Sequence, residues 1–261
     1  MAAGLDRETL EGLYDRYNRR EFVHPDPLEF LYDYDEIADR EIVALVASSL
    51  AYGKVAQIIK SVAAVLERMG PTPAVFLRAS SPRSLETKLS GLKHRMTTGR
   101  DLARVLAGAK TVIERYGSLN TCFASKMNAG YETVIPALSS FVAEVSEESG
   151  GSCEFHLPSP DGGSACKRLN LFLRWLVRKD EVDPGGWEGV PLSKLVVPLD
   201  THMHKICYKY GLTARKQADL RAALEITARF REIAPDDPVK YDFALTRLGI
   251  RDDAVSSHVS Y

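Results

Sequence analysis

Helical periodicity is the feature that most constrains what this chain can fold into. Apolar residues recur at spacings of three and four through most of the sequence, and strict apolar–polar alternation is almost absent. Gly, Pro, Ser and Asp separate the periodic segments, as they do between helices. The pattern predicts an all-α protein with helices over Leu5–Tyr17, Ala38–Tyr52, Lys54–Met69, Ser80–Arg95, Leu102–Tyr116, Tyr131–Glu148, Ala165–Arg178, Thr201–Tyr210, Lys216–Glu232 and Val239–Leu248.

The size of the chain suits one large helical domain or two helical subdomains that share a cleft. Of its 261 residues 45% are hydrophobic and 26% are charged, so enough apolar side chains are present to build a core. We expect a single all-α domain over residues 1–255, followed by a loose tail at 251–261. Within it we expect a core subdomain at about 36–150 and an active-site subdomain at about 134–250.

Several classes of protein are excluded by composition. No apolar run reaches the roughly 18 residues of a transmembrane helix, and the first residues are charged and amphipathic rather than a signal segment. We therefore expect a cytoplasmic protein with no membrane partner. The cysteines are scattered without the C-x-x-C spacing of a zinc site, which favours buried thiols: Cys122, Cys153, Cys166 and Cys207.

Charge is distributed unevenly along the chain. The net charge of −1 argues against a large nucleic-acid footprint. Residues 161–216, however, contain ten Lys or Arg and six Asp or Glu, which leaves the remainder acidic. A local basic patch of this kind suits salt-sensitive contact with a few phosphates.

Lys167 stands at the start of a predicted helix, directly after a glycine-rich turn. Gly162 and Gly163 permit a tight turn and Ser164 can cap the helix, which puts Lys167 near its third position. The positive end of the helix dipole favours the uncharged amine that a nucleophilic lysine needs. Three further polar residues share its face of the helix: Asn170, Arg174 and Arg178. The simplest interpretation of that face is a solvated basic surface.

Asp200 precedes a second helix, where its simplest role is the N-cap, worth about 1 kcal/mol. That role does not exclude chemistry, because an ionised carboxylate at this position also stabilises a nearby cation. His202 and Lys205 project from the polar face of the same helix, within reach of a nucleic-acid backbone. His202 and His204 are two residues apart and point in different directions, which disfavours a shared zinc site.

Two segments resemble motifs of one enzyme superfamily. Gly163-Ser-Ala-Cys-Lys167 and Val197-Pro-Leu-Asp200-Thr-His202 resemble the glycine-rich hairpin with its catalytic lysine, and the aspartate segment, of the helix–hairpin–helix DNA glycosylases. Lys167 and Asp200 stand 33 positions apart, similar to the archaeal 8-oxoguanine glycosylase branch, where an inserted loop separates the two as KDEVDPGGWEG does here. Asp242, in KYDFALTRLGI, is similar to a later aspartate of that branch that contacts the flipped base.

The sequence as a whole also resembles a bacterial domain family of unknown function placed near these glycosylases. The resemblance covers most of the chain through the segments PLEFLYDY, IVALVASSLAYGK, GGSACKRLNLFLRWLVRKDEVD, PLDTHMHKI and DPVKYDFALTRLGI. Two features depart from the glycosylase pattern. The hairpin has Gly163-Ser164-Ala165 in place of G-x-G, and the C-terminal four-cysteine run is absent, so we expect no iron–sulfur cluster.

The glycosylase resemblance implies an all-α fold with two helical subdomains around a cleft, and a DNA base-excision repair activity. It implies a glycosylase and AP lyase that removes an oxidised purine such as 8-oxoguanine from damaged double-stranded DNA, with no metal or organic cofactor. Lys167 is then the nucleophile, Asp200 stabilises the cationic sugar, and Asp242 binds the extruded base. Candidate base-stacking residues are Phe172 and Trp175, with Tyr52 and Trp187 as further aromatics. Candidate DNA contacts are Gly163, Arg168, Arg174, His202 and Lys205. We expect a monomer.

Three other functions remain open at this stage. A helical nucleic-acid-binding module could keep the fold without the chemistry, and the neutral charge and altered hairpin favour it. A metal-dependent hydrolase could use Asp200, His202 and His204. An inert scaffold would leave Lys167 as an ordinary surface residue.

Overall fold

The computed structural model describes residues 5–149 and 153–247 and confirms the all-α class. The first half contains α1 (Arg7–Tyr17), η1 (Arg20–Phe22), η2 (Pro27–Asp33), α2 (Ile37–Ser49), α3 (Val55–Met69), α4 (Pro73–Ala79), α5 (Pro82–Lys88), β1 (Lys93–His94), β2 (Thr97–Thr98), α6 (Gly99–Tyr116) and α7 (Leu119–Lys126). The second half contains α8 (Ile135–Glu148), η3 (Pro160–Gly162), α9 (Lys167–Val177), η4 (Leu192–Lys194), α10 (Thr201–Lys209) and α11 (Leu220–Ile233). Residues 242–247 are also helical.

Side-chain caps explain where many of these helices begin. Thr98 and Asp101 form a reciprocal capping box at the start of α6, which satisfies two backbone N–H groups that the helix itself leaves unpaired. Side chains cap six further α-helices or 3-10 helices through single acceptors: Asp6, Asp26, Ser81, Ser118, Ser159 and Asp219. Gly70 and Gly117 end α3 and α6 as the sequence predicts.

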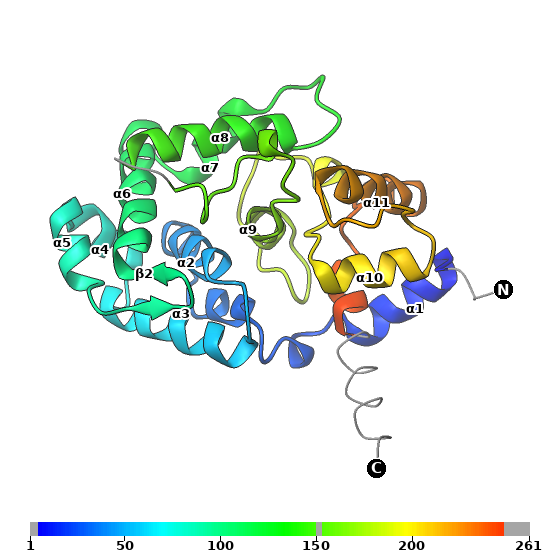
Figure 1. The fold of residues 1–261 in the computed structure, drawn as a ribbon, viewed down its shortest axis with the longest axis horizontal. Helices are drawn as coiled ribbons and strands as arrows, with labels where there is room; N and C mark the ends of the chain where they lie inside the picture. The colour runs from blue at the N-terminus through cyan, green and yellow to red at the C-terminus, as the bar shows by residue number, and fades with distance from the viewer. Residues whose placement is uncertain (1–4, 150–152, 248–261) are drawn as a thin grey trace, which may run out of the picture.

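Helix α9 runs through the middle of the molecule, where Figure 1 views it almost end-on. Helices α2 to α7 lie on one side of it, α1, α10 and α11 lie on the other, and α8 lies along one edge. Because α9 has helices on both sides, every residue from Leu169 to Val177 is buried. No helix within residues 5–149 and 153–247 is both long enough and apolar enough to cross a membrane.

Close packing of α6 against α8 depends on a glycine. A Cβ on Gly108 would lie 2.2 Å from the carbonyl oxygen of Val145, so only a residue without a side chain permits this approach. Phe123 and Phe141 fill the neighbouring core with ring centroids 5.6 Å apart. The two helices thereby form a rigid wall beside α9.

The exposed basic face predicted for α9 is wrong. Asn170, Arg174 and Arg178 are all less than 5% exposed. Arg178 pairs with Asp180, Asp183 and Asp237, and Arg174 pairs with Asp183 and Asp242. Buried charges of this kind require partners, and the carboxylates come from segments beyond α9.

The region after α5 also differs from the prediction. The helix expected over Ser80–Arg95 ends at Lys88, and a two-stranded antiparallel hairpin pairs Lys93 with Thr98 and His94 with Thr97. Gly91 and Arg95 have positive φ values of 75° and 54°, which a helix cannot accommodate. Helices α4 and α7 were not predicted, and the last helix begins at residue 242 rather than at Val239. The predicted tail at 251–261 lies outside the described residues.

Candidate active site

Lys167 is the first residue of α9, two positions earlier in the helix than the sequence predicts. The residue before it, Cys166, has a left-handed backbone with φ 47° and ψ 39°, and its side chain makes no capping bond. Ser164 does not cap the helix either. Its hydroxyl accepts the backbone N–H of Cys166 at 3.2 Å, which closes the turn that leads into α9. The lysine therefore leaves the helix at its extreme N-terminus, where the backbone changes direction.

Asp200 is the N-cap of α10, as predicted. Its Oδ1 atom accepts the backbone N–H groups of His202 and Met203, both at 2.9 Å. These two bonds fix the carboxylate plane and leave Oδ2 directed away from the helix. One oxygen thus supports the fold while the other remains available for a neighbour.

The neighbour of that second oxygen is Lys167. The Nζ atom of Lys167 lies 3.8 Å from Asp200 Oδ2 and donates a hydrogen bond of 3.2 Å to the carbonyl oxygen of Ala51. The two side chains are 28% and 40% exposed, so both are partly withdrawn from solvent. The structure thereby brings together the beginnings of two helices that are far apart in sequence.

Lys167 and Asp200 line two cavities. One, which we call the Asp242 cavity, has a volume of about 300 Å³ and is also lined by Pro25, Asp26, Arg174, Met203, Asp242 and Arg247. The other, the Arg168 cavity, has a volume of about 580 Å³ and is also lined by Tyr52, Pro158, Ser164, Arg168, Thr201 and His202. Both volumes fall in the range of small-molecule sites. The amine and the carboxylate therefore stand between a narrower recess and a wider one.

Asp242 is buried in the wall of the narrower recess. It is only 4% exposed, and its Oδ2 accepts a short hydrogen bond from Arg174 Nη1. Burial, together with the nearby Asp200, raises the pKa of Asp242 to about 6, against the opposing effect of Arg174. A carboxyl group in this state can either accept or donate a hydrogen bond near neutral pH.

Arg168 lies at the wider recess among aromatic rings. Its guanidinium donates to the carbonyls of Ser49 and Phe155, and it stacks over the rings of Tyr52 at 5.2 Å and Phe155 at 4.9 Å. Burial lowers the pKa of Arg168 from its usual value. The side chain is thus held in place by the protein, with Phe155 itself 44% exposed beside it.

Several of the other residues predicted to contact DNA are buried. Phe172 and Trp175 are 0% and 1% exposed, so they belong to the core and neither presents a ring on which a base could stack. Arg174 is buried in its ion pairs and cannot meet a phosphate at the surface. Gly163, with φ 77°, and Lys205 are exposed, and His202 lines the Arg168 cavity.

The residues proposed for a metal hydrolase do not converge. His204 is buried, and its Nε2 atom hydrogen-bonds the carbonyl of Arg215 at 2.9 Å. In the part of the chain that the structure describes, no three His, Cys, Asp or Glu side chains form a group that could hold a metal ion. This arrangement disfavours a site built from Asp200, His202 and His204.

The comparisons with known proteins identify a family. Residues 26–251 match the model of a family described as a protein of unknown function, DUF2400. The chain belongs to this family. Searches of curated proteins and of solved structures each found no match. The match confirms the resemblance to an uncharacterised domain family and gives no support to the glycosylase superfamily.

Two parts of the site were missed by sequence reasoning. The carbonyl of Ala51 holds Lys167, and the side chain of Arg95 lies against Gly53, which lines both cavities. A Cβ on Gly53 would lie 2.7 Å from Arg95 Cδ, and Gly53 itself has φ 96°. The dipeptide after the apolar segment of α2, Tyr52-Gly53, was the available signal, because a glycine there marks a turn that another chain segment approaches closely.

Proposed function

We propose that this protein is a DNA glycosylase with AP-lyase activity that removes an oxidised purine, such as 8-oxoguanine, through a Schiff base on Lys167. The observation that supports this most strongly is the pairing of Lys167 Nζ with Asp200 Oδ2 at 3.8 Å, between two cavities. An amine with a carboxylate beside it is the arrangement that a lysine nucleophile needs.

The reaction requires a nucleotide turned out of the duplex into the site. The amine of Lys167 attacks C1′ of the deoxyribose, and a proton passes from the attacking nitrogen to Asp200. The bond from C1′ to the base breaks, and its electron pair leaves with the base, which takes up a proton. Asp200 also stabilises the positive charge that develops on the sugar, because its Oδ2 lies 3.8 Å from the attacking nitrogen.

The second half of the reaction explains the strand break. The C1′–O4′ bond opens, its electron pair goes to O4′, which takes up the proton held by Asp200, and a C=N bond forms between C1′ and the lysine nitrogen. Loss of a proton from C2′ then expels the 3′ phosphate by β-elimination. No step needs an oxidant, a reductant or a metal.

Two neighbouring groups suit the substrate. Asp242 lies in the wall of the narrower recess, where a carboxyl group with a pKa of about 6 can hydrogen-bond the edge of an extruded base. Arg168 and His202 line the wider recess, where their nitrogen atoms suit the flanking phosphates. Because Lys167 lines both recesses, a single nucleotide bound at this residue can occupy both.

Borohydride trapping tests this proposal. Duplexes that contain 8-oxoguanine or an abasic site are incubated with the protein and sodium borohydride, which reduces the imine to a stable cross-link. We expect a covalent product with the wild type and none with Lys167→Gln. Asp200→Asn keeps an oxygen acceptor for the N-cap but removes the negative charge, so it should fold and trap at least about 100-fold more slowly.

Lys179→Gln is the matched control, since Lys179 is an exposed lysine outside both cavities. It should trap like the wild type. If the wild type binds these duplexes but forms no cross-link, the protein is a binding module without the chemistry. Equal trapping by wild type and Lys167→Gln would show that another amine reacts.

A further inference from the structure

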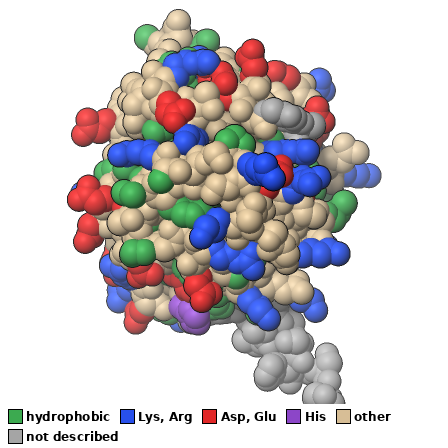
Figure 2. All heavy atoms as spheres, turned by 90° about the vertical axis from the view of Figure 1, so that its left-hand side faces the viewer, with side chains coloured by type: hydrophobic (Ala, Val, Ile, Leu, Met, Phe, Trp, Pro, Cys, Tyr) green, Lys and Arg blue, Asp and Glu red, His purple; other side chains and the backbone are tan. Residues whose placement is uncertain are grey.

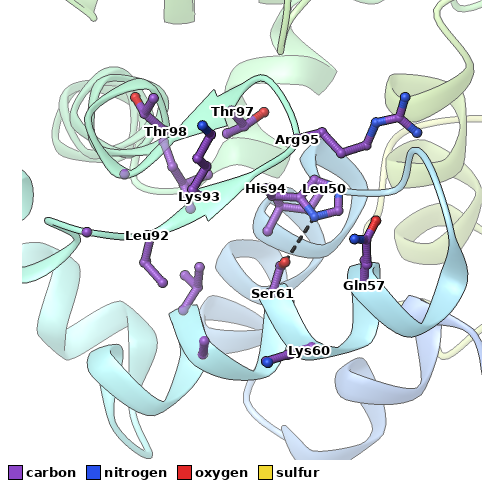
Figure 3. A pocket seen from close by; sticks show the side chains of 15 residues that line it. Leu50, Gln57, Lys60, Ser61, Leu92, Lys93, His94, Arg95, Thr97 and Thr98 are labelled. Atoms are coloured by element: carbon purple, nitrogen blue, oxygen red, sulfur yellow. Dashed lines mark hydrogen bonds between the residues drawn. The ribbon is translucent and has the colours of Figure 1, made fainter.

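A third cavity lies beside the site, between helix α3 and the β1–β2 hairpin. We call it the hairpin cavity; its volume is about 360 Å³. Figure 3 shows Lys93 and His94 on the hairpin above it and Gln57, Lys60 and Ser61 on α3 below it. Its apolar lining comes from Leu50, Ala64, Val65, Leu92 and Leu102. The cavity thus has an apolar floor and a polar rim.

The charge of the rim has one sign. Of the described residues that line the hairpin cavity, three are Lys or Arg and none is Asp or Glu: Lys60, Lys93 and Arg95. Lys60 and Lys93 are exposed, so both ammonium groups are accessible to a solute. In Figure 2, which views this side of the molecule, Lys and Arg side chains spread across the centre and right, with Asp and Glu mainly along the left, upper and lower edges. An anion is the ligand that such a rim favours.

The walls of the cavity are held by a hydrogen-bond chain. The Nε2–H of His94 donates to the carbonyl of Tyr52, and its Nδ1 hydrogen-bonds the hydroxyl of Ser61, each at 2.9 Å. The hydroxyl of Tyr52 lies 2.8 Å from the carbonyl of His94 and 2.6 Å from Thr97 Oγ1. These bonds join the hairpin to α3 and to the loop before it, so the hairpin cavity is preformed.

The same bonds connect the hairpin cavity to Lys167. Tyr52 lines the Arg168 cavity, and Gly53 lines both cavities at Lys167. Arg95 begins the two-residue turn of the hairpin with a strained φ of 54°, and its side chain extends over Gly53 and lies 5.9 Å from the ring of Tyr52. Figure 3 shows this side chain directed away from the hairpin cavity. The positive charge of Arg95 therefore lies between the hairpin cavity and Gly53, which lines both cavities at Lys167.

We propose that the hairpin cavity binds a phosphate group of the DNA strand next to the extruded nucleotide. The identification of the ligand as DNA rests on the proposed function. The inference that the cavity binds a phosphate ester rests only on the residues of its rim. Lys60 and Lys93 supply the positive charge, the Gln57 amide supplies an N–H donor, and the apolar floor accepts the adjoining sugar. The hairpin cavity and the Lys167 site adjoin at Tyr52 and Gly53. This arrangement favours a DNA strand that contacts both sites rather than a separate small molecule.

The test compares salt dependence of DNA binding. Fluorescence anisotropy measures the affinity of wild type and Lys60→Ala/Lys93→Ala for a labelled duplex with a tetrahydrofuran abasic analogue, and for the undamaged duplex, over a salt series. The variant should weaken binding to both duplexes by the same factor, and the slope of log K against log salt should fall by about 0.9 for one phosphate lost.

Lys179→Ala/Lys209→Ala is the matched control, because it removes the same charge from exposed lysines that line none of the three cavities. Equal slopes for Lys60→Ala/Lys93→Ala and this control would overturn the proposal. A second arm measures thermal stabilisation by inorganic phosphate and by a nucleoside monophosphate. Stabilisation of the wild type but not of Lys60→Ala/Lys93→Ala, with unchanged DNA slopes, would overturn the assignment to DNA and identify a small phosphorylated ligand.

The two proposals fail separately. Absence of any covalent trapping by the wild type defeats the glycosylase chemistry, yet the slope comparison on undamaged duplex still decides whether the hairpin cavity binds phosphate. Normal trapping by the wild type, with equal salt slopes for Lys60→Ala/Lys93→Ala and the control variant, defeats only the proposal for the hairpin cavity.

Discussion

Replacing Arg174 by Met tests how the buried charges next to the site are balanced. The guanidinium lies between two buried carboxylates, with Nε 3.2 Å from Asp183 Oδ1 and Nη1 bonded to Asp242. Methionine fills similar space without charge. Asp183 also pairs with Arg178, at 3.1 Å, and so keeps one cation, whereas Arg174 is the only cation paired with Asp242 among the described residues.

The size of the loss is set by how easily Asp242 takes up a proton. Breaking a buried ion pair costs about 3–5 kcal/mol when a charge is left unpaired. Burial raises the pKa of Asp242 to about 6 even though Arg174 lowers it, so the loss of Arg174 raises this pKa further and the carboxyl takes up a proton at pH 7. One pH unit corresponds to about 1.4 kcal/mol, which limits the electrostatic loss to roughly 1 kcal/mol at pH 7 and roughly 3 kcal/mol at pH 8. At pH 5 Asp242 is protonated in both proteins and the loss is about zero.

The direction of the pH dependence follows from proton binding. In the unfolded chain this carboxyl ionises near pH 3.9, whereas the folded variant retains the proton to a pH above 6. Unfolding of the variant therefore releases a proton, and its stability falls as pH rises. The wild type is ionised in both states above pH 6 and lacks this slope.

Urea unfolding at pH 5, 6, 7 and 8, followed by far-ultraviolet circular dichroism, measures the difference in unfolding free energy between wild type and Arg174→Met. We expect the difference to grow by up to about 1.4 kcal/mol for each pH unit above pH 6. The double variant Arg174→Met/Asp242→Asn has no carboxyl to protonate and should lose most of this slope. A pH-independent difference, or an equal slope in the double variant, would refute this account of Asp242.

Three smaller predictions concern the scaffold. Gly108→Ala should lower the unfolding free energy by about 1–3 kcal/mol in thermal or urea unfolding, because its Cβ would meet the carbonyl of Val145 at 2.2 Å. Gly12→Ala, in an exposed part of α1 with nothing within 4 Å of the added Cβ, should instead raise stability by up to about 1 kcal/mol; a loss there would contradict the open space. Thr98→Ala removes the capping box with Asp101 and should cost about 1 kcal/mol by the same measurement, whereas no change would show that the box is redundant.

Helix positions were predictable where a local rule decides them. Gly70 and Gly117 end α3 and α6, and Ser81 with Pro82 begins α5, because a cap or a positive φ acts within a few residues. The hairpin at residues 93–98 was not predictable in this way. Its strands have two residues each, too few to show alternation, and its pairing depends on the contacts of Tyr52 with His94 and Thr97.

The face of α9 shows a different limit. Periodicity correctly places Asn170, Arg174 and Arg178 on one side of the helix, but it cannot say what that side meets. Burial was decided by carboxylates outside the helix, at Asp180 and Asp183 and much later at Asp237 and Asp242. Arginine is usually exposed, so only tertiary structure reverses that expectation.

Asp200 in the candidate site shows both a feature set by a local rule and a feature set by tertiary contacts. The N-cap rule alone predicts that Asp200 accepts backbone N–H groups, and the structure has both bonds on Oδ1. Because those bonds fix the carboxylate, the direction of Oδ2 is also determined locally, but its neighbour is not. Lys167 reaches it only because Cys166 turns left-handed and Ala51, at the end of α2, holds the amine from the other side. The N-cap bonds of Asp200 therefore fix the carboxylate, and the approach of α2 to α9 places Lys167 beside it.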